Sequence, residues 1–266
     1  MSPRLTVITI CRNVRAALER TAASVLAQRD PRIEYRVVDG GSTDGTLETL
    51  AALEAQGVHT LSEPDRGISD AMNKGVRLAG GEWVAHLHAD DTYLPGALAR
   101  MLDEIEPDDA DVLCGWMIKH EDTGDILCRC DPSRLPLDMT VNHPATFVRR
   151  SMFERYGGFD ATLRNAMDYD FFLRLFLAGA RFRVVPFAVS RMTAGGQSER
   201  SLWKTLGETH AVRRRLLTKG VSRTTPYLWA LYMKGSIRIA LQAAGLNGFV
   251  RWWRRHLAWP PKGEDA

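Results

Sequence analysis

Roughly the first 120 residues alternate short apolar segments with amphipathic ones, and this alternation limits the folds open to the chain. The apolar segments have the length and β-branched content of strands, whereas the amphipathic segments repeat apolar residues every three or four positions, as helices do. Strands are predicted at residues 5–10, 35–38, 58–61, 83–87 and 111–118, and helices at 14–28, around 47–53, 68–78 and 94–105. This order predicts an α/β domain with a doubly wound, mainly parallel sheet and helices on both faces. Ligands bind such sheets beyond the carboxyl ends of the strands, so polar loops at those ends are candidate sites.

The second half of the chain is less regular. We expect a hairpin turn at residues 123–125, a strand over 142–148 entered through Pro144, a helix over 168–178 and a β-rich segment over 182–192. From residue 201 onward the pattern is helical. A length of 266 residues suits one α/β domain with a helical appendage. We therefore predict a domain over 1–200 and an extension over 201–266.

The four cysteines, Cys11, Cys114, Cys128 and Cys130, lack the C-x-x-C spacing of zinc and redox sites. We expect buried free thiols, which are typical of a reducing cytoplasm. The apolar run at 5–10 is too short for a secretory signal, and no uninterrupted apolar stretch has the length of a membrane span. These features predict a cytoplasmic protein.

The first candidate loop, DGGSTDG at residues 39–45, follows a predicted strand and opens a helix. A carboxylate at a strand end can accept hydrogen bonds from a base or a ribose, and glycines let a ligand approach the backbone. Asp39 is therefore a candidate for nucleotide binding, while a tight turn with a helix cap from Ser42 or Thr43 would have the same pattern. The loop matches neither the G-x-G-x-x-G pattern of nicotinamide sites nor the P-loop pattern.

The second candidate, EPDRGISDAMNKG at residues 63–75, contains a cation in front of a predicted helix. Arg66 and free backbone amides at the helix start could hold a phosphate. Asp70 and Asn73 are three positions apart and share a helix face. The alternative is a helix start that is simply solvated.

The third candidate, HLHADD at residues 86–91, ends the fourth predicted strand, and strand alternation would place His86, His88 and Asp90 on one side. Adjacent carboxylates in a cleft repel each other unless a cation joins them. A hard divalent metal that is shared with substrate phosphates would explain Asp90 and Asp91. A polar turn is the alternative.

Two later segments complete a set of six: NHPATFV at 142–148 with FERYGGFD at 153–160, and AMDYDFFLRL at 166–175. The others are TVITI at 6–10, VDGGSTDGT at 38–46, the 63–75 segment and LHADD at 87–91. In this order, the six resemble the family 2 glycosyltransferases of the GT-A fold, over roughly residues 4–198. A single segment is a modest signal, whereas six in order are a strong one.

The resemblance implies inverting transfer of a sugar from a nucleotide diphosphate, uridine diphosphate by default, to a hydroxyl of a saccharide or lipid-linked acceptor. Such reactions belong to cell-surface polysaccharide or glycolipid synthesis. The resemblance also implies that Asp168 deprotonates the acceptor. Asp90 and Asp91 would bind Mn²⁺ or Mg²⁺ together with the diphosphate, with His88 as a further candidate ligand. Asp39 would hold the nucleobase and His143 would lie near the donor. The implied donor-binding set is Thr9, Asp39, Arg66, Asp70, Asn73, Asp90 and His143.

Two positions depart from the pattern of the family. His88 stands where many relatives have the first aspartate of a D-x-D motif, and Met167 replaces an acidic neighbour of the base. The chemistry itself needs only a base and positive charge for the departing diphosphate. Asp168 or Asp170 could instead be a helix N-cap.

Two other functions remain as alternatives. A sugar nucleotidyltransferase usually has a glycine-rich basic loop after its first strand, where this chain has CRNV at 11–14. A non-catalytic membrane-surface scaffold would explain the departures at His88 and Met167.

The extension over 201–266 is strongly basic, with 12 Lys/Arg against 3 Asp/Glu, while residues 1–200 have a net charge of −6. Its tryptophans lie among arginines, and the apolar stretch 226–246 is interrupted by Lys234 and Arg238. We predict that it docks on an anionic membrane, peripherally at the cytoplasmic face. A helical cap on the catalytic domain or on a second subunit of a homo-oligomer is the alternative, and nucleic acid is not an expected partner. The aromatic and basic residues that motivate this prediction are Trp203, Trp229, Tyr232, Trp252, Trp253, Trp259, Arg213, Arg214, Arg215, Arg251, Arg254 and Arg255.

Overall fold

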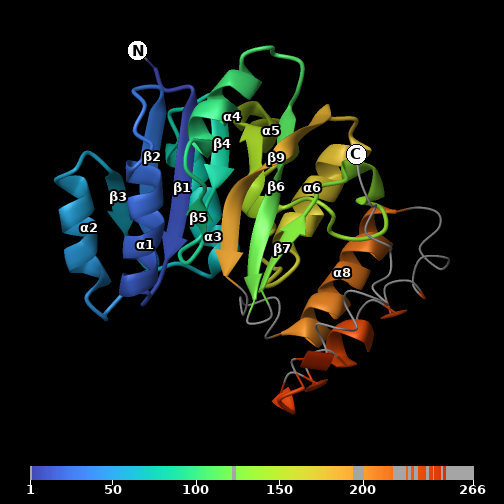
Figure 1. Cartoon of the computed structure of the whole chain (residues 1–266). Helices are drawn as coiled ribbons and strands as arrows, with labels where there is room; N and C mark the ends of the chain where they lie inside the picture. Colours follow the sequence, from blue (N-terminus) through green and yellow to red (C-terminus); the bar gives the residue numbers. More distant parts are fainter. Residues whose placement is uncertain are drawn as a thin grey trace.

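The computed structural model describes residues 2–121, 124–193 and 201–217, together with short stretches between 226 and 249. The first half follows the predicted alternation of strands and helices (Figure 1). Its elements are β1 (Leu5–Cys11), α1 (Arg15–Leu26), β2 (Ile33–Asp39), α2 (Thr46–Glu54), β3 (His59–Ser62), α3 (Ile68–Leu78), β4 (Trp83–His86), β5 (Thr92–Tyr93) and α4 (Ala97–Ile105). The second half comprises β6 (Val112–Glu121), β7 (Gly124–Cys128), η1 (Pro132–Arg134), η2 (His143–Ala145), β8 (Thr146–Arg149), α5 (Arg150–Tyr156), α6 (Met167–Leu177), β9 (Phe182–Thr193) and α8 (Leu202–Leu216).

One sheet joins all the described strands in the order β3-β2-β1-β4-β8-β6-β9-β5, with β7 paired to β6. The predicted α/β fold class is confirmed. The first four strands in this order run parallel. β8 is antiparallel to both β4 and β6, and β9 returns parallel to β6, so the second half of the sheet mixes directions. The carboxyl ends of β1, β2 and β4 therefore meet at one edge, the lower edge in Figure 1.

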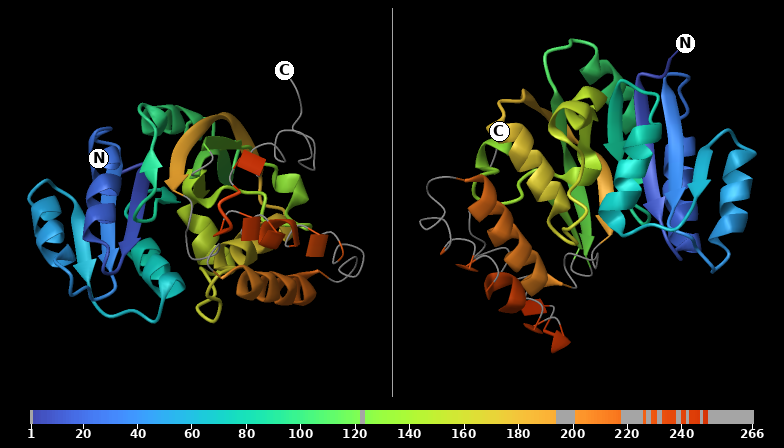
Figure 2. Two further views of the ribbon diagram at one scale, coloured as in Figure 1. Left: turned by 60° about the horizontal axis from the view of Figure 1, so that its bottom comes forward. Right: turned by 180° about the vertical axis from the view of Figure 1, so that it is seen from behind.

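Helices cover both faces of the sheet because its strands alternate apolar side chains between the faces. Leu5 and Val7 of β1 pack with α1, α2 and α4, whereas Ile8 and Ile10 pack with α3, α5 and α6. The rear view in Figure 2 shows α3 and α6 on the face opposite to α1. Each face thus has its own apolar core.

The structure differs from the prediction around Pro144. The expected strand over 142–148 begins only at Thr146, because Pro144 lies in a short 3₁₀ turn and has no N–H for a strand ladder. The short helix α5 and the two-residue strand β5 were not predicted, since neither is long enough to show a periodicity. The expected turn at 123–125 falls partly outside the described residues.

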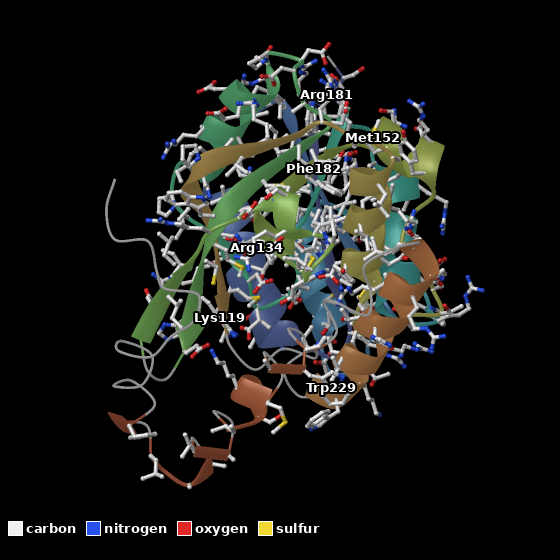
Figure 3. The ribbon with its side chains drawn as sticks, turned by 90° about the vertical axis from the view of Figure 1, so that its right-hand side faces the viewer. Lys119, Arg134, Met152, Arg181, Phe182 and Trp229 are labelled. Atoms are coloured by element: carbon white, nitrogen blue, oxygen red, sulfur yellow. The ribbon has the colours of Figure 1, made fainter. Side chains whose placement is uncertain are left out.

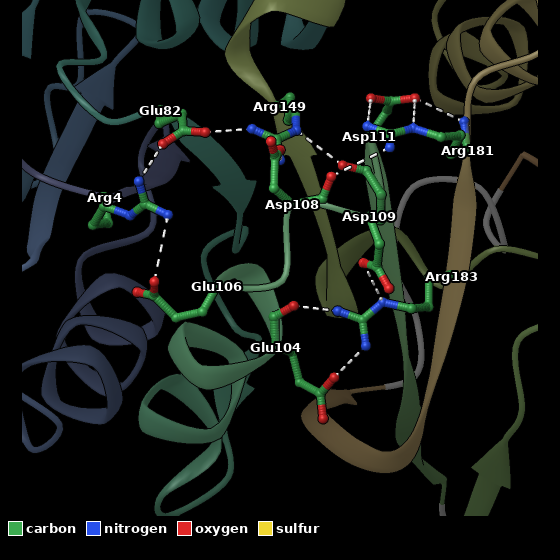
Figure 4. Close-up of polar contacts among 11 residues, drawn as sticks. Arg4, Glu82, Glu104, Glu106, Asp108, Asp109, Asp111, Arg149, Arg181 and Arg183 are labelled. Carbon is green, nitrogen blue, oxygen red and sulfur yellow. Dashed lines mark hydrogen bonds and ion pairs between the residues drawn. The ribbon is translucent and has the colours of Figure 1, made fainter.

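A network of ion pairs lies at the edge opposite to the carboxyl ends of the parallel strands (Figure 4). Arg149 pairs with both Glu82 and Asp108, and Arg4 reaches Glu82 at 2.6 Å. These contacts join β4, β8 and the segment before β6. Much of the network is partly exposed, so it contributes little free energy of unfolding per pair.

The helix α8 packs against α6, and the two lie side by side in Figures 1 and 2. Arg215 of α8 bridges Asp160 at 2.9 Å and Asp170 at 2.5 Å. The first helix beyond the predicted boundary at residue 200 is therefore attached to the α/β domain. Among the described residues, none of the helices combines the length and apolarity that crossing a membrane requires.

The cysteines are all free thiols. Cys11, Cys114 and Cys130 are buried and Cys128 is half-buried. The prediction of buried free thiols is confirmed for three of the four positions.

Candidate active site

Asp39 ends β2 and organises its own loop. Its carboxylate accepts hydrogen bonds from the backbone N–H groups of Gly41 and Ser42, at 3.1 and 2.9 Å, and from the hydroxyls of Ser42 and Ser62. Burial raises the pKa of this carboxyl, but these hydrogen bonds outweigh the burial and hold the pKa below its ordinary value. Asp39, which is fully buried, is therefore ionised at neutral pH. Its predicted contact with a nucleobase stays a prediction.

The loop before α3 is shaped around Arg66. Asp70 accepts hydrogen bonds from the backbone N–H and the guanidinium of Arg66, both at 3.1 Å. The Arg66 side chain itself is 81% exposed, so its guanidinium is open to an anion in front of the helix. Asp70 thus orients Arg66.

Asn73 connects α3 to the segment that leads toward α6. Its side-chain amide donates to the carbonyl of Phe159 at 2.8 Å and accepts from the N–H of Phe159 at 2.9 Å. Ser69 donates to the carbonyl of Leu163 at 3.3 Å. These contacts bring the start of α3 and the approach to α6 to one edge of the sheet, while the donor contact predicted for Asn73 stays a prediction.

The acidic pair after β4 is held by α1. The Thr21 hydroxyl donates to the carbonyl of Asp91 at 2.8 Å and accepts from the N–H of Asp90 at 3.0 Å. The side chain of Asp90, 44% exposed, forms an ion pair with Arg20. Asp90 has a φ of 92°, a conformation that non-glycine residues rarely adopt and that is often found at functional sites.

Asp91 has a carboxyl whose environment calls for a cation. Burial, and next the charge of Asp90, raise the pKa of Asp91 to about 8, so without a cation it is protonated at neutral pH. The residues that the structure describes include no group of three or more His, Cys, Asp or Glu placed to hold a metal. Two carboxylates fit a divalent ion that takes its other ligands from substrate phosphates and water.

Three histidines form a cluster between β4 and α6. The ring of His143 lies 5.4 Å from that of His86 and 5.3 Å from that of His88, between ring centroids. Burial lowers the pKa of His88 to about 4, and the pKa of His143 falls well below its ordinary value, so both rings are neutral. His86 and His88 share a side as predicted, but the chain turns after His88 and Asp90 faces α1 instead. The ring of His143 also reaches Phe172 of α6, at 5.7 Å.

Asp168 lies in the first turn of α6, four residues before Phe172 and on the same helix face. The N-cap position is Ala166, so neither Asp168 nor Asp170 is the cap that the sequence left open. Burial raises the pKa of the half-buried Asp168 carboxyl to about 6. A carboxylate with a pKa near the working pH is suited to general base catalysis.

Thr9 lies inside the sheet, and its predicted contact with the donor stays a prediction. Its side chain is fully buried within the sheet and accepts a hydrogen bond from the Tyr35 hydroxyl at 3.0 Å. Conversely, Thr21 was missed, although a polar residue on the apolar face of the predicted helix, between Leu18 and Val25, is a usable signal.

The mixed α/β sheet with its strand-end loops defines a glycosyltransferase of the GT-A type. The family model "Glycosyl transferase family 2" matches residues 6–179, and the chain belongs to this family. A PGL/p-HBAD biosynthesis glycosyltransferase of Mycobacterium tuberculosis is 34% identical over 182 residues, covering 66% of this chain and 70% of that relative. An uncharacterized glycosyltransferase of the same species is 33% identical over 186 residues, covering 65% and 69%.

Two solved structures share the fold. The mannosyltransferase PcManGT of Pyrobaculum calidifontis, in complex with GDP-Man and Mn²⁺, has a TM-score of 0.67 and 19% identity, covering 97% of this chain and 82% of its own. Residues 1–349 of S. aureus TarS, in complex with UDP-GlcNAc, have a TM-score of 0.65 and 16% identity, covering 96% and 76%.

Proposed function

We propose that this protein is an inverting, metal-dependent glycosyltransferase with Asp168 as its general base. The observation that carries the proposal is the carboxyl of Asp168, whose pKa of about 6 matches its task, on a helix that contacts the His143 turn. The segment that enters this helix contacts the Arg66 loop, because Arg164 donates to the carbonyl of Arg66. Family membership supports glycosyl transfer as the reaction class.

Each group then has a role in a single displacement. The Asp168 carboxylate takes the proton of the acceptor hydroxyl while the acceptor oxygen bonds to the anomeric carbon. The bond from that carbon to the diphosphate oxygen breaks, and the configuration at the carbon inverts. The exposed guanidinium of Arg66 is available to the departing diphosphate.

Asp90 and Asp91 would hold a divalent ion, Mn²⁺ or Mg²⁺, jointly with the phosphates of the donor. A bound ion would stabilise negative charge on the leaving group without proton transfer. The raised pKa of Asp91 supports this assignment, as does the Mn²⁺ in the complex of the structurally similar mannosyltransferase.

We propose a uridine diphosphate sugar as donor and a saccharide or lipid-linked hydroxyl as acceptor. The UDP-GlcNAc complex of TarS supports the donor class, and the name of the mycobacterial relative supports a glycolipid acceptor. Thermal-shift measurements with UDP and GDP, each with Mn²⁺, Mg²⁺ or a chelator, test the donor site. A ligand at 100 times its Kd stabilises by about 2.7 kcal/mol. If neither nucleotide raises Tm with either metal, the donor assignment is wrong. Pyrophosphate release from a nucleoside triphosphate and a sugar phosphate would favour the nucleotidyltransferase alternative, and binding without turnover would favour the scaffold.

We also propose that the extension docks on an anionic membrane. Trp203, Trp229, Met233 and Ile237 are each about half exposed. Trp203 lies in the first turn of α8, and its ring is 5.9 Å from that of Trp229, which is labelled in Figure 3. The basic contribution is smaller than the sequence predicted, because Arg213 is buried and Arg215 is paired.

Several residues of the extension that the sequence prediction names lie outside the described residues: Tyr232, Arg238, Arg251, Trp252, Trp253, Arg254, Arg255 and Trp259. Because basic residues are attracted to anionic headgroups, co-sedimentation of the protein with vesicles should increase with the anionic lipid fraction and decrease with salt. Equal binding to neutral vesicles would rule out electrostatic docking.

A further inference from the structure

The segment that enters α6 has no cap of its own. Ala166 occupies the N-cap position and has no side-chain acceptor. The backbone N–H groups of Arg164, Asn165 and Ala166 instead donate to one group, the carboxylate of Glu208 on α8, with N···O distances of 2.7 to 3.1 Å. A negative charge at this place is also favoured by the dipole of α6.

We infer that Glu208 is a positioning residue for Asp168. Its carboxylate fixes the backbone at 164–166, and this backbone leads directly into the first turn of α6, where Asp168 lies. The inference rests on the proposed role of Asp168 as general base. α8 lies beyond the segment that the family model matches, so the base of this enzyme is held by a helix outside that segment.

The effect of Glu208 should reach the chemical step more than donor binding. Arg164 does connect the same segment to the donor loop, because its guanidinium donates to the carbonyl of Arg66 at 2.8 Å. Asp70 holds Arg66 independently, through two hydrogen bonds of 3.1 Å. Loss of Glu208 therefore leaves the Arg66 loop anchored while it frees the start of α6.

Two substitutions separate a positioning role from a general loss of structure. Glu208→Ala removes every acceptor. Glu208→Gln keeps the length and one oxygen, and a single oxygen suffices because the N–H groups of Arg164, Asn165 and Ala166 all reach Oε2. Oδ1 of Asn165 is buried without a hydrogen-bond partner, so after rotation of the Asn165 amide it can accept from the new NH₂ group.

Arg215→Ala is the matched control on the same helix. It removes the ion pairs of α8 with Asp160 and Asp170, but it leaves the N–H groups at 164–166 bound to Glu208. Asp170 keeps its partner Arg174 at 2.9 Å. This variant should lose stability without a specific loss of turnover.

The experiment compares steady-state kinetics and hydrogen–deuterium exchange at residues 164–168 in the full-length wild type and the three variants. Glu208→Ala should lower kcat at least about tenfold, because small misplacements of catalytic groups are costly. Its donor KM should stay within about twofold of wild type. Glu208→Gln should recover kcat to within about threefold, and Arg215→Ala should keep wild-type kcat and exchange at 164–168.

Several results would overturn the inference. One is a kcat of Glu208→Ala equal to that of the wild type, measured at a temperature at which the variant is folded. Others are equal losses in the Gln and Ala variants, or a rise in KM with unchanged kcat. If the wild type is active and any of these results is obtained, only the positioning role of Glu208 is refuted, and the proposed function stands. No transfer by the wild type with any donor refutes the proposed function, and the inference falls with it.

Discussion

Replacing Asp168 by asparagine should make the protein more stable and nearly inactive at once. Burial raises the pKa of Asp168 from an ordinary 3.8 to about 6. A shift of about 2 units corresponds to about 3 kcal/mol of free energy of unfolding. Because the folded state binds the proton more tightly, this stability is present below pH 3.8 and is lost as the pH rises to about 6. The carboxyl is only half-buried, so solvent screening reduces the effect to roughly 1–2 kcal/mol, or about 2–6 °C in Tm.

The assay is a set of melting curves of wild type and Asp168→Asn from pH 4 to pH 8, with turnover measured in parallel. The gain in Tm should be small near pH 4, grow up to about pH 6 and then stay constant. Turnover should fall at least ~10²-fold, since the amide cannot accept the proton. A gain that does not change with pH, or a variant with normal turnover, would refute the reasoning.

Three further predictions concern pH, metal and packing. In the wild type, kcat/KM should rise with pH through about 6, because Asp168 must lose its proton to act as base; a pH–rate profile without this limb would contradict the assignment. Asp90→Ala should abolish turnover with an unchanged Tm, and a chelator should do the same to wild type; full activity of the variant in chelator would exclude a metal role for Asp90. Gly75→Ala should lower the free energy of unfolding by about 1–3 kcal/mol, because the new Cβ would lie 2.5 Å from Cγ2 of Ile8. Urea melts measure this change, and an unchanged midpoint would show that the interface of α3 with β1 can relax.

Local patterns predicted those parts of the site that depend on neighbours in sequence. The strand and helix periods predicted the elements from β1 to α3, and strand alternation predicted that His86 and His88 share one side of the strand. Strand alternation predicted the wrong side for Asp90, because periodicity assumes a regular backbone and Asp90 lies in a turn with a positive φ.

The remaining features depend on contacts between residues far apart in the chain. Thr21 meets the acidic pair some seventy positions later, and Glu208 meets the start of α6 from a segment that looked merely basic. Burial, which sets the pKa of Asp168 and Asp91, likewise arises only when distant segments pack together. A sequence pattern can mark a polar residue on an apolar helix face, such as Thr21, but it does not show which distant residue that side chain meets.

The stereochemistry of sugar transfer tests the central claim most directly. Wild type and Asp168→Asn are incubated with Mn²⁺ and a panel of nucleotide sugars of known anomeric configuration, with water or a simple sugar alcohol as acceptor. Proton NMR then records the first product before it mutarotates. The account predicts release of the nucleoside diphosphate, a first product of inverted configuration from the wild type, and at least ~10²-fold less product from Asp168→Asn. A product that retains the configuration of the donor, or equal rates for the two proteins, would contradict it.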